Sequence, residues 1–369
     1  MAHLISSGQF PTDWSFIVRR TIAIVAGTAL AAGTVAMASP ASADENIPGG
    51  GASFPYVFLS QCLTDFNASQ NNFNVEYTST GSGTGKGNFT KGTFVYAQSD
   101  SKFKPGTAPS WGWTYIPNIG GAITFPINLK NKNNGRSLGS AIQLKQGTLT
   151  KIMAGKITNW RDREILRSNP RIAAGIPNQK ITVVYRADKS GTTNNLLQHF
   201  NSWSPTIWSS VEDIMSTAFP GGKPPSNSIS GNKNAGVMAQ IQKTNGAIGY
   251  VDLGDSKGYP AARIQNKKGQ YVAPSSRSAA RNLANQTDVQ ASGLVDLNYN
   301  VNVSGAYPIA IFSYGLGRTD GKGPNGLGVR QFQDYVIQKC GPSRASSLGF
   351  VPVGGKVLAK AKQLVRKIK

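Results

Sequence analysis

The apolar residues of this chain alternate between two spacings, the two-residue period of strands and the three-to-four-residue period of helices. Strand-like runs cover residues 74–78, 92–100 and 181–185, and helix-like spacing marks residues 58–66 and 196–200. Glycine, serine and threonine are frequent at the junctions between these runs. The pattern therefore places the residues that could bind a ligand at strand ends and helix starts.

The junction after the third strand predicts an anion-binding turn. A helix that starts after a small-residue turn leaves its first backbone N–H groups without intrahelical partners, and these groups attract an anion. The hydroxyls of Ser190, Thr192 and Thr193 add donors, and Arg186 adds a fork-shaped cation that Asp188 is placed to hold. The same residues are compatible with a capped helix and an exposed arginine, so this stretch alone leaves both interpretations open.

A glycine-rich segment at residues 79–86 follows the first strand. It does not match a Walker loop, which needs glycine where Thr80 stands and serine or threonine where Gly87 stands. It also lacks the third glycine of a dinucleotide fingerprint. The segment remains a candidate nest that holds a small anion through backbone N–H groups and Ser82.

Two other junctions carry polar side chains. The run Gly49–Pro55 precedes the first helix and places the Ser53 hydroxyl near its N-terminus, where a plain N-cap is the alternative. Asp100 stands at the polar end of the strand at 92–100.

The N-terminus has the features of an export signal. Arg19 and Arg20 precede an apolar run over residues 21–37, and an Ala-x-Ala sequence ends at Ala43. We therefore predict a signal peptide over residues 1–43 and an exported protein. No cysteine stands at the cleavage position, so we expect no lipid anchor there.

Composition adds a strong positive charge to this picture. The chain has 369 residues, enough for one large or two medium domains, and a net charge of +22. Such a charge favours anionic partners. The basic residues are scattered except at the C-terminus, and no zinc-finger or RNA-binding motif occurs, so we expect no nucleic-acid partner.

Few residues are available for metal binding or nucleophilic catalysis. Cys62 and Cys340 are the two cysteines, and export favours one disulfide between them over two buried free thiols. His199 is the one histidine left after cleavage, and it falls on a predicted helix. No His/Cys or Asp/Glu cluster has the spacing of a metal centre. We therefore expect no metal, no cofactor and no catalytic residues.

Taken in order, these segments resemble the phosphate-binding proteins of bacterial phosphate ABC transporters. No single motif decides the resemblance, but the ordered set is specific and covers essentially all of the mature chain. The matching segments are Gly49–Pro55, Gly81–Gly85, Ser99–Asp100, Lys151–Trp160, Arg186–Thr192, Gly246–Val251, Tyr307–Ile309 and Leu348–Pro352.

The resemblance implies an α/β fold of the type II-like periplasmic-binding-protein class, with two lobes, crossing hinge strands and a ligand cleft. It implies a first lobe of residues 44–118 and 307–369 and a second lobe of residues 119–306. The run Gly120–Ile127 is similar to one crossing strand. The polar stretch Gln265–Arg281 shows no clear period.

The resemblance also implies the residues that bind phosphate, with Asp188 supporting Arg186 from behind. Three positions depart from the family pattern: Ser53 replaces a threonine, Gln98 replaces a small residue and could crowd the site, and Lys189 adds charge at the rim. The implied phosphate contacts are Ser53, the backbone of Phe54, Ser82, Asp100, Arg186, Ser190, Gly191 and Thr192.

The function implied is capture of inorganic phosphate by an exported, monomeric, non-enzymatic protein that delivers it to a phosphate ABC permease. A secreted phosphatase or other phosphoester-processing enzyme on the same scaffold is the alternative. The basic amphipathic segment Lys356–Lys369 has two interpretations, a terminal helix of the family or an attachment to anionic lipid or cell-surface polymer.

Overall fold

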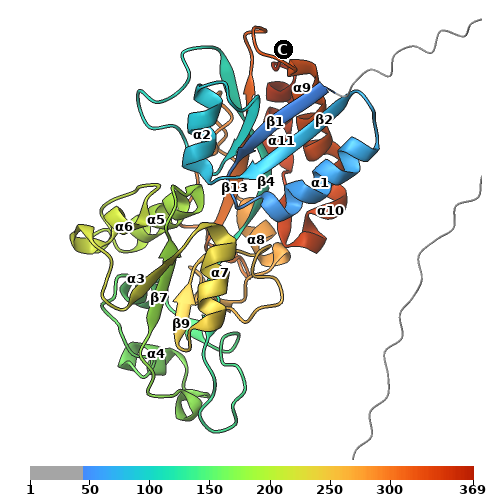
Figure 1. Ribbon diagram of the computed structural model, residues 1–369. Helices are drawn as coiled ribbons and strands as arrows, with labels where there is room; N and C mark the ends of the chain where they lie inside the picture. Colours follow the sequence, from blue (N-terminus) through green and yellow to red (C-terminus); the bar gives the residue numbers. More distant parts are fainter. Residues whose placement is uncertain (1–44) are drawn as a thin grey trace, which may run out of the picture. The chain divides into compact units, whose positions relative to one another are not determined.

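The computed structural model describes residues 45–369, and Figure 1 shows their arrangement. The predicted signal peptide therefore lies outside the described residues. Within the described part, no helix is both long and apolar enough to cross a membrane.

A seven-stranded mixed sheet forms the centre of the first lobe. β1 pairs in parallel with β2 and β3, whereas β13 pairs antiparallel with both β3 and β4. The spatial order is β10-β4-β13-β3-β1-β2, with β14 also on β4. Its strands are β1 (Glu45–Gly51), β2 (Phe73–Ser79), β3 (Tyr96–Ser99), β4 (Trp113–Thr124), β10 (Val251–Asp252), β13 (Ala310–Arg318) and β14 (Phe350–Pro352).

Most of the helices that pack on this sheet come from the two ends of the described chain and lie in the upper part of Figure 1, while α8 (Ser276–Leu283) lies near the middle. Their apolar residues form one continuous core with the strands, because each helix turns one face inward. They are α1 (Tyr56–Ala68), α2 (Ser82–Thr90), α8 (Ser276–Leu283), α9 (Gly326–Tyr335), a π-helical segment (Val336–Cys340), α10 (Gly341–Arg344), a 3-10 turn (Ser346–Leu348) and α11 (Gly355–Val365).

The second lobe, in the lower part of Figure 1, is built on a four-stranded sheet of order β5-β9-β7-β8. A small sheet of order β12-β11-β6 accompanies it. The strands are β5 (Ile127–Asn128), β6 (Gln143–Leu144), β7 (Thr182–Arg186), β8 (Ser228–Gly231), β9 (Ala247–Gly249), β11 (Arg263–Gln265) and β12 (Tyr271–Val272). The helices are α3 (Gln146–Met153), α4 (Arg163–Ser168), α5 (Gly191–Trp203), α6 (Met215–Ala218) and α7 (Lys233–Lys243), with 3-10 turns at Ala173–Gly175 and Pro220–Gly222.

The chain passes between the two sheets along β4 and returns to the first sheet along β13. The expected crossing strand at 120–127 is in fact the end of the longer β4, and it stops at Thr124, before Pro126. Proline has no backbone N–H to donate to a strand ladder, so β5 begins after it. The lobe boundary that we place at residue 118 falls inside β4 and remains a proposal.

The disulfide prediction is confirmed. Cys62 of α1 and Cys340 at the end of the π-helical segment are bonded, with an S–S distance of 1.98 Å, and both are buried. The bond joins segments 278 residues apart in sequence. It therefore ties the first helix of the lobe to the returning C-terminal segment.

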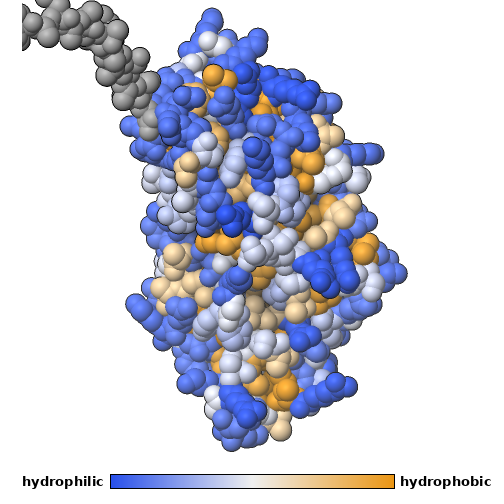
Figure 2. All heavy atoms as spheres, turned by 90° about the vertical axis from the view of Figure 1, so that its right-hand side faces the viewer, coloured by the Kyte–Doolittle hydropathy of each residue, from blue (hydrophilic) through white to orange (hydrophobic). Residues whose placement is uncertain are grey.

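Two stretches remain to be compared with the sequence predictions: residues 265–281, which showed no period, and the C-terminal segment, which had two interpretations. The stretch 265–281, in which no period was found, contains β12 and the start of α8, a short helix that a capping box of Ser275 and Ser278 begins. In α11 the apolar positions Val357, Leu364 and Val365 are buried in the core. The apolar face of this helix is therefore already covered. On the side of the molecule in Figure 2, hydrophilic residues are interspersed with smaller apolar patches.

Candidate functional site

Asp100 is the centre of a buried polar cluster at the carboxyl end of β3. Its side chain is almost inaccessible, with 3% of the residue exposed. The Ser313 hydroxyl on β13 donates to Oδ1 at 2.7 Å. Oδ2 lies 3.5 Å from Ser82 Oγ on α2 and 3.4 Å from Thr192 Oγ1 on α5. The cluster therefore combines residues of both lobes.

Arg186 is the last residue of β7 and is 1% exposed. Its Nε and one terminal nitrogen donate to the two oxygens of Asp188, at 2.8 and 2.5 Å. The other terminal nitrogen donates to Asn234 Oδ1 at 2.8 Å. A guanidinium has five N–H donors, so these three bonds leave one N–H on each terminal nitrogen for another acceptor. The arrangement holds the guanidinium plane from two sides.

The N-terminus of α5 supplies the second group of donors. Ser190 is the N-cap, and its hydroxyl oxygen accepts from the Thr193 N–H at 3.1 Å. Because the oxygen is used as an acceptor, the hydroxyl proton remains available for donation. Asn195, one turn further along, donates to the Asp100 carbonyl at 2.6 Å and fixes α5 against the end of β3.

Gly191 sits at a point of close approach between the lobes. A Cβ at this position would lie 2.5 Å from Ser82 Oγ and 2.8 Å from Asp100 Cβ. Side-chain atoms essentially never approach so closely, so a glycine is needed for the two lobes to meet as they do. The structure thus describes a closed arrangement of the two lobes.

Ser53 lies before α1, between β1 and the helix. The helix begins at Tyr56 with Pro55 at the cap position, so the alternative interpretation of Ser53 as a plain N-cap does not hold. Its hydroxyl oxygen is buried and has no hydrogen-bond partner among residues 45–369. Buried polar groups are rarely left unpaired, so this hydroxyl fits a polar ligand. The neighbouring Phe54 packs its ring against Phe350.

The glycine-rich segment differs from the expected anion nest. The backbone N–H groups of Thr80 and Gly81 both donate to the carbonyl oxygen of Gly51, at 2.9 and 2.8 Å, and that of Gly83 donates to Lys189 across the lobe interface. These N–H groups are therefore occupied within the protein. The glycines serve close packing, since a Cβ on Gly85 would lie 2.4 Å from Gly51.

Burial and nearby charge shift the pKa of a carboxylate in opposite directions, and a different one of the two effects is larger at Asp100 and at Asp188. Burial raises the pKa of Asp100 to about 6, although Ser313 and Arg186 partly offset it. Burial alone would also raise the pKa of Asp188, but the hydrogen bonds and charge of Arg186 outweigh it and hold that pKa below its usual value. Asp188 is therefore the permanent counter-ion of Arg186, while Asp100 is a titratable acceptor.

Comparison with known proteins identifies the family. Residues 36–339 match the family model described as the PBP superfamily domain. The phosphate-binding protein PstS of Xylella fastidiosa strain Temecula1 is 31% identical over 284 residues, which is 75% of this chain and 74% of that protein. The chain belongs to the PstS-like branch of the PBP superfamily.

Solved structures agree with this family on the fold. PfluDING, a high-affinity periplasmic phosphate-binding protein solved with bound phosphate, superposes with a TM-score of 0.67 at 20% identity, over 86% of this chain and 93% of that one. A shorter match exists to alkaline phosphatase L of Pseudomonas aeruginosa, 29% identical over 224 residues, 56% of this chain and 55% of that protein. The expected two-lobe α/β fold is thus confirmed.

Two of the three departures from the family pattern, Gln98 and Lys189, lie away from the Asp100 cluster. Gln98 accepts from Asn118 at 3.1 Å, and Asn118 also donates to Gln333, so Gln98 belongs to a buried amide group beside α9. No hydrogen bond of the described residues joins the Gln98 side chain to the Asp100 cluster. Lys189 is exposed beside the junction of Gly83 and the second lobe, which places its charge at the rim.

Sequence reasoning missed several polar partners. Ser313 and Asn234 contact Asp100 and Arg186 from distant segments, and no local motif marks them. Lys86, the last residue of the glycine-rich segment, forms a buried ion pair with Asp213 at 3.0 Å. Each partner lies far away in sequence, so only the fold brings these side chains together.

Within residues 45–369, no group of three His, Cys, Asp or Glu side chains could hold a metal. His199 is buried on α5 with neither ring nitrogen hydrogen-bonded, and burial lowers its pKa to about 3. It is therefore neutral near pH 7, and its ring packs on Tyr299.

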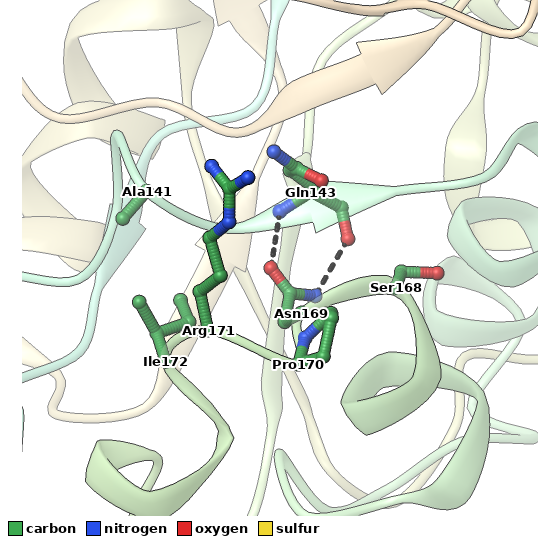
Figure 3. Close-up of a pocket in the computed structure, with 7 residues that line it drawn as sticks. All are labelled: Ala141, Gln143, Ser168, Asn169, Pro170, Arg171 and Ile172. Atoms are coloured by element: carbon green, nitrogen blue, oxygen red, sulfur yellow. Dashed lines mark hydrogen bonds between the residues drawn. The ribbon is translucent and has the colours of Figure 1, made fainter.

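A separate surface pocket, shown in Figure 3, lies between β6 and the end of α4. Asn169 exchanges two hydrogen bonds of 2.8 Å with the backbone of Gln143 there. These bonds satisfy the amide, and the one charged lining residue, Arg171, is exposed. The pocket therefore lacks the buried, unpaired donors that distinguish the interlobe cluster.

Proposed function

We propose that this protein binds inorganic phosphate between its two lobes, at the cluster of Asp100, Arg186 and the α5 N-terminus. The observation that carries the proposal is one buried carboxylate facing a set of buried donors with spare hydrogen-bonding capacity. The phosphate contacts that we propose are Ser53, the Phe54 backbone, Ser82, Asp100, Arg186, Ser190, Gly191 and Thr192.

The donors match a tetrahedral oxyanion. Arg186 keeps two free N–H groups, and the hydroxyls of Ser190 and Ser53 are free to donate. Charge-assisted bonds of this kind are about twice as strong as neutral ones, and the positive end of α5 adds to them. Burial excludes water, which would otherwise compete for each donor.

Asp100 gives the site its preference among anions. Near neutral pH phosphate keeps at least one proton, which can be donated to an ionised carboxylate. Sulfate has no proton, so it would place an acceptor against an acceptor and a negative charge against another in a dry site. The PstS relatives are named as phosphate-binding proteins, which supports phosphate as the ligand.

The test is a calorimetric titration of the mature protein after phosphate has been stripped from it by reversible unfolding. We expect one phosphate per chain and sulfate binding that is at least tenfold weaker. Absence of heat with phosphate, under conditions where the protein is folded, would overturn the proposal.

A phosphatase remains the second candidate, since one relative is named alkaline phosphatase L. We infer a binding protein rather than an enzyme, because the buried cluster offers phosphate hydrogen bonds without an activated nucleophile. The measurement is release of phosphate from p-nitrophenyl phosphate with and without added divalent metal, which we expect to stay at the buffer rate. We also propose that the protein is exported, acts as a monomer and passes phosphate to an ABC permease.

A further inference from the structure

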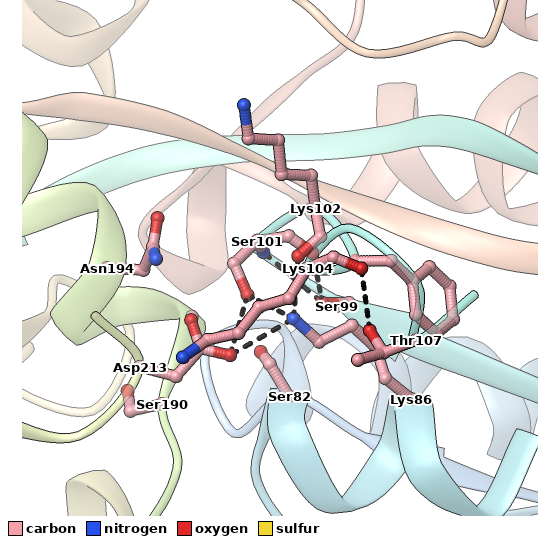
Figure 4. Close-up of polar contacts among 12 residues, drawn as sticks. Ser82, Lys86, Ser99, Ser101, Lys102, Lys104, Thr107, Ser190, Asn194 and Asp213 are labelled. Atoms are coloured by element: carbon pink, nitrogen blue, oxygen red, sulfur yellow. Dashed lines mark hydrogen bonds and ion pairs between the residues drawn. The ribbon is translucent and has the colours of Figure 1, made fainter. Parts of the chain in front are cut away.

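Lys86 is the one buried lysine within residues 45–369, and it is not among the proposed phosphate contacts. Figure 4 shows its ammonium group surrounded by oxygen atoms of both lobes. Nζ lies 2.8 Å from Ser101 Oγ, 2.8 Å from the Lys102 carbonyl oxygen and 3.0 Å from Asp213 Oδ2. An ammonium has three N–H donors, so all of them are used.

These three acceptors are divided between the lobes. Ser101 and Lys102 follow β3 in the first lobe, and Lys86 lies on α2 of the same lobe. Asp213 belongs to the segment between α5 and α6 of the second lobe. An opening of the lobes would therefore remove only Asp213 from Lys86 and leave the other two acceptors in place.

Asp213 is also connected to the proposed phosphate site. Its backbone carbonyl accepts from the Ser190 N–H at 2.8 Å, and Ser190 is the N-cap of α5. The same residue thus fixes the turn that donates to the anion and pairs with a lysine of the opposite lobe. Its side chain is 10% exposed and that of Lys86 is 8% exposed.

A second ion pair crosses the same interface and provides a comparison. Lys104 and Glu212 lie 2.5 Å apart, but their side chains are 59% and 36% exposed. Solvent and salt screen such a pair, and it contributes little. A desolvated pair is favourable only when its geometry is good and its other hydrogen bonds are made, as they are for Lys86.

We propose that the Lys86–Asp213 pair is an interlobe latch that forms only on closure, positions the Ser190 turn and limits the rate of phosphate release. The inference rests on the proposed function, since it concerns the same site. Lys86 is a positioning residue, because its donors are all engaged and none is left for phosphate.

The test is stopped-flow measurement of phosphate association and release on the stripped full-length mature protein, with Lys86→Met and Asp213→Asn. Loss of a latch destabilises only the closed state, so we expect release to be roughly 10- to 100-fold faster and association to change less than about threefold. The matched control is Lys104→Met, which should release phosphate within about twofold of the parent.

The outcomes separate the latch from the phosphate site itself. If the parent does not bind phosphate, the proposed function fails. If the parent binds and the folded variants release phosphate at the parental rate, the latch is overturned. Should Lys86→Met not fold, Asp213→Asn gives the same comparison, because it keeps the side-chain shape and the carbonyl that accepts from Ser190.

A salt series provides a further check. The rate of phosphate release by the parent should not increase between about 0.05 and roughly 0.5 M NaCl, since a buried ion pair is poorly screened.

Discussion

Two Arg-x-Asp sequences in this protein form nearly the same local structure in very different places. Arg186 ends β7 and pairs with Asp188, whereas Arg318 ends β13 and pairs with Asp320. In both cases Nε donates to one carboxylate oxygen and a terminal nitrogen to the other, at 2.8 and 2.5 Å in the first pair and 2.7 and 3.0 Å in the second.

The surroundings of the two pairs differ. The side chain of Arg186 is 1% exposed and holds a further contact to Asn234, with Asp100 and the α5 donors nearby. The side chain of Arg318 is 26% exposed, and its guanidinium lies 4.5 Å from the ring centre of Trp111. The motif therefore fixes only an oriented guanidinium. Burial and the partners brought in by other segments turn one of the two into a candidate anion site.

Removal of each arginine in turn tests whether only the buried pair binds phosphate. Arg186→Ala should weaken phosphate binding by about 2–5 kcal/mol, roughly 30- to 4000-fold in Kd, because a buried charged partner is lost. Arg318→Ala should leave the Kd within about twofold of the parent, since its pair is solvent-accessible. Isothermal titration calorimetry measures both. Equal effects of the two substitutions would show that general positive charge, and not the buried pair, attracts the anion.

The second prediction concerns the loss of folding stability caused by burying the ionised Asp100 carboxylate beside Arg186. The pKa of its carboxyl rises from 3.8 to about 6, so the folded state binds a proton more tightly than the unfolded state. Stability from this group is present below pH 4 and is lost as the pH rises through about 6. Asp100→Asn should therefore stabilise phosphate-free protein at pH 8, by up to about 3 kcal/mol for about two pKa units.

The measurement is urea unfolding of parent and Asp100→Asn at pH 8 and pH 4.5, without phosphate. Bound phosphate would stabilise the parent by mass action and hide the effect, so its removal is essential. The gain should shrink at pH 4.5. A variant no more stable than the parent at pH 8 would mean that Ser313 and Arg186 already compensate for burial of the charge.

The site also shows what a sequence can predict and what it cannot. Local pattern placed Arg186, Asp188 and Ser190 on a strand–turn–helix, because each of those features depends on near neighbours in the chain. It did not reveal Ser313 or the Lys86–Asp213 pair, because a serine inside a strand or a lysine in a helix has no distinctive spacing. Nor did it show that the carbonyl of Gly51, on another strand, occupies the Thr80 and Gly81 N–H groups of the glycine-rich segment, whose Ser82 stays among the proposed phosphate contacts.

The third prediction tests whether Asp100 makes the site around the buried Arg186 prefer phosphate to sulfate. Among the described residues Arg318 pairs with no carboxylate besides Asp320, so this pair should attract phosphate and sulfate alike. At the buried pair, Asp100→Asn should lower the phosphate-to-sulfate preference by roughly 30-fold, about 2 kcal/mol, because an amide can donate to sulfate as well as accept from phosphate. Competition titrations at one ionic strength and pH 7.5 measure the ratio, and an unchanged ratio would remove Asp100 from this role.

The fourth prediction tests whether phosphate binding requires the close contact between the lobes at Gly191. Gly191→Ala adds a methyl group that would lie 2.5 Å from Ser82 Oγ and 2.9 Å from the Ser101 backbone nitrogen, so one lobe must shift. Overpacking of this kind costs about 1–2 kcal/mol, which corresponds to roughly 5- to 30-fold weaker phosphate binding if closure is needed for capture. The matched control is Gly87→Ala on α2, where a Cβ meets nothing within 4 Å. It should bind phosphate like the parent and melt slightly higher, because alanine is a better helix former than glycine. If Gly191→Ala keeps the parental Kd, phosphate binding does not require the lobes to approach as closely as they do here. The difference in phosphate binding between the two Arg-x-Asp pairs would then depend on Arg186 and its immediate partners alone.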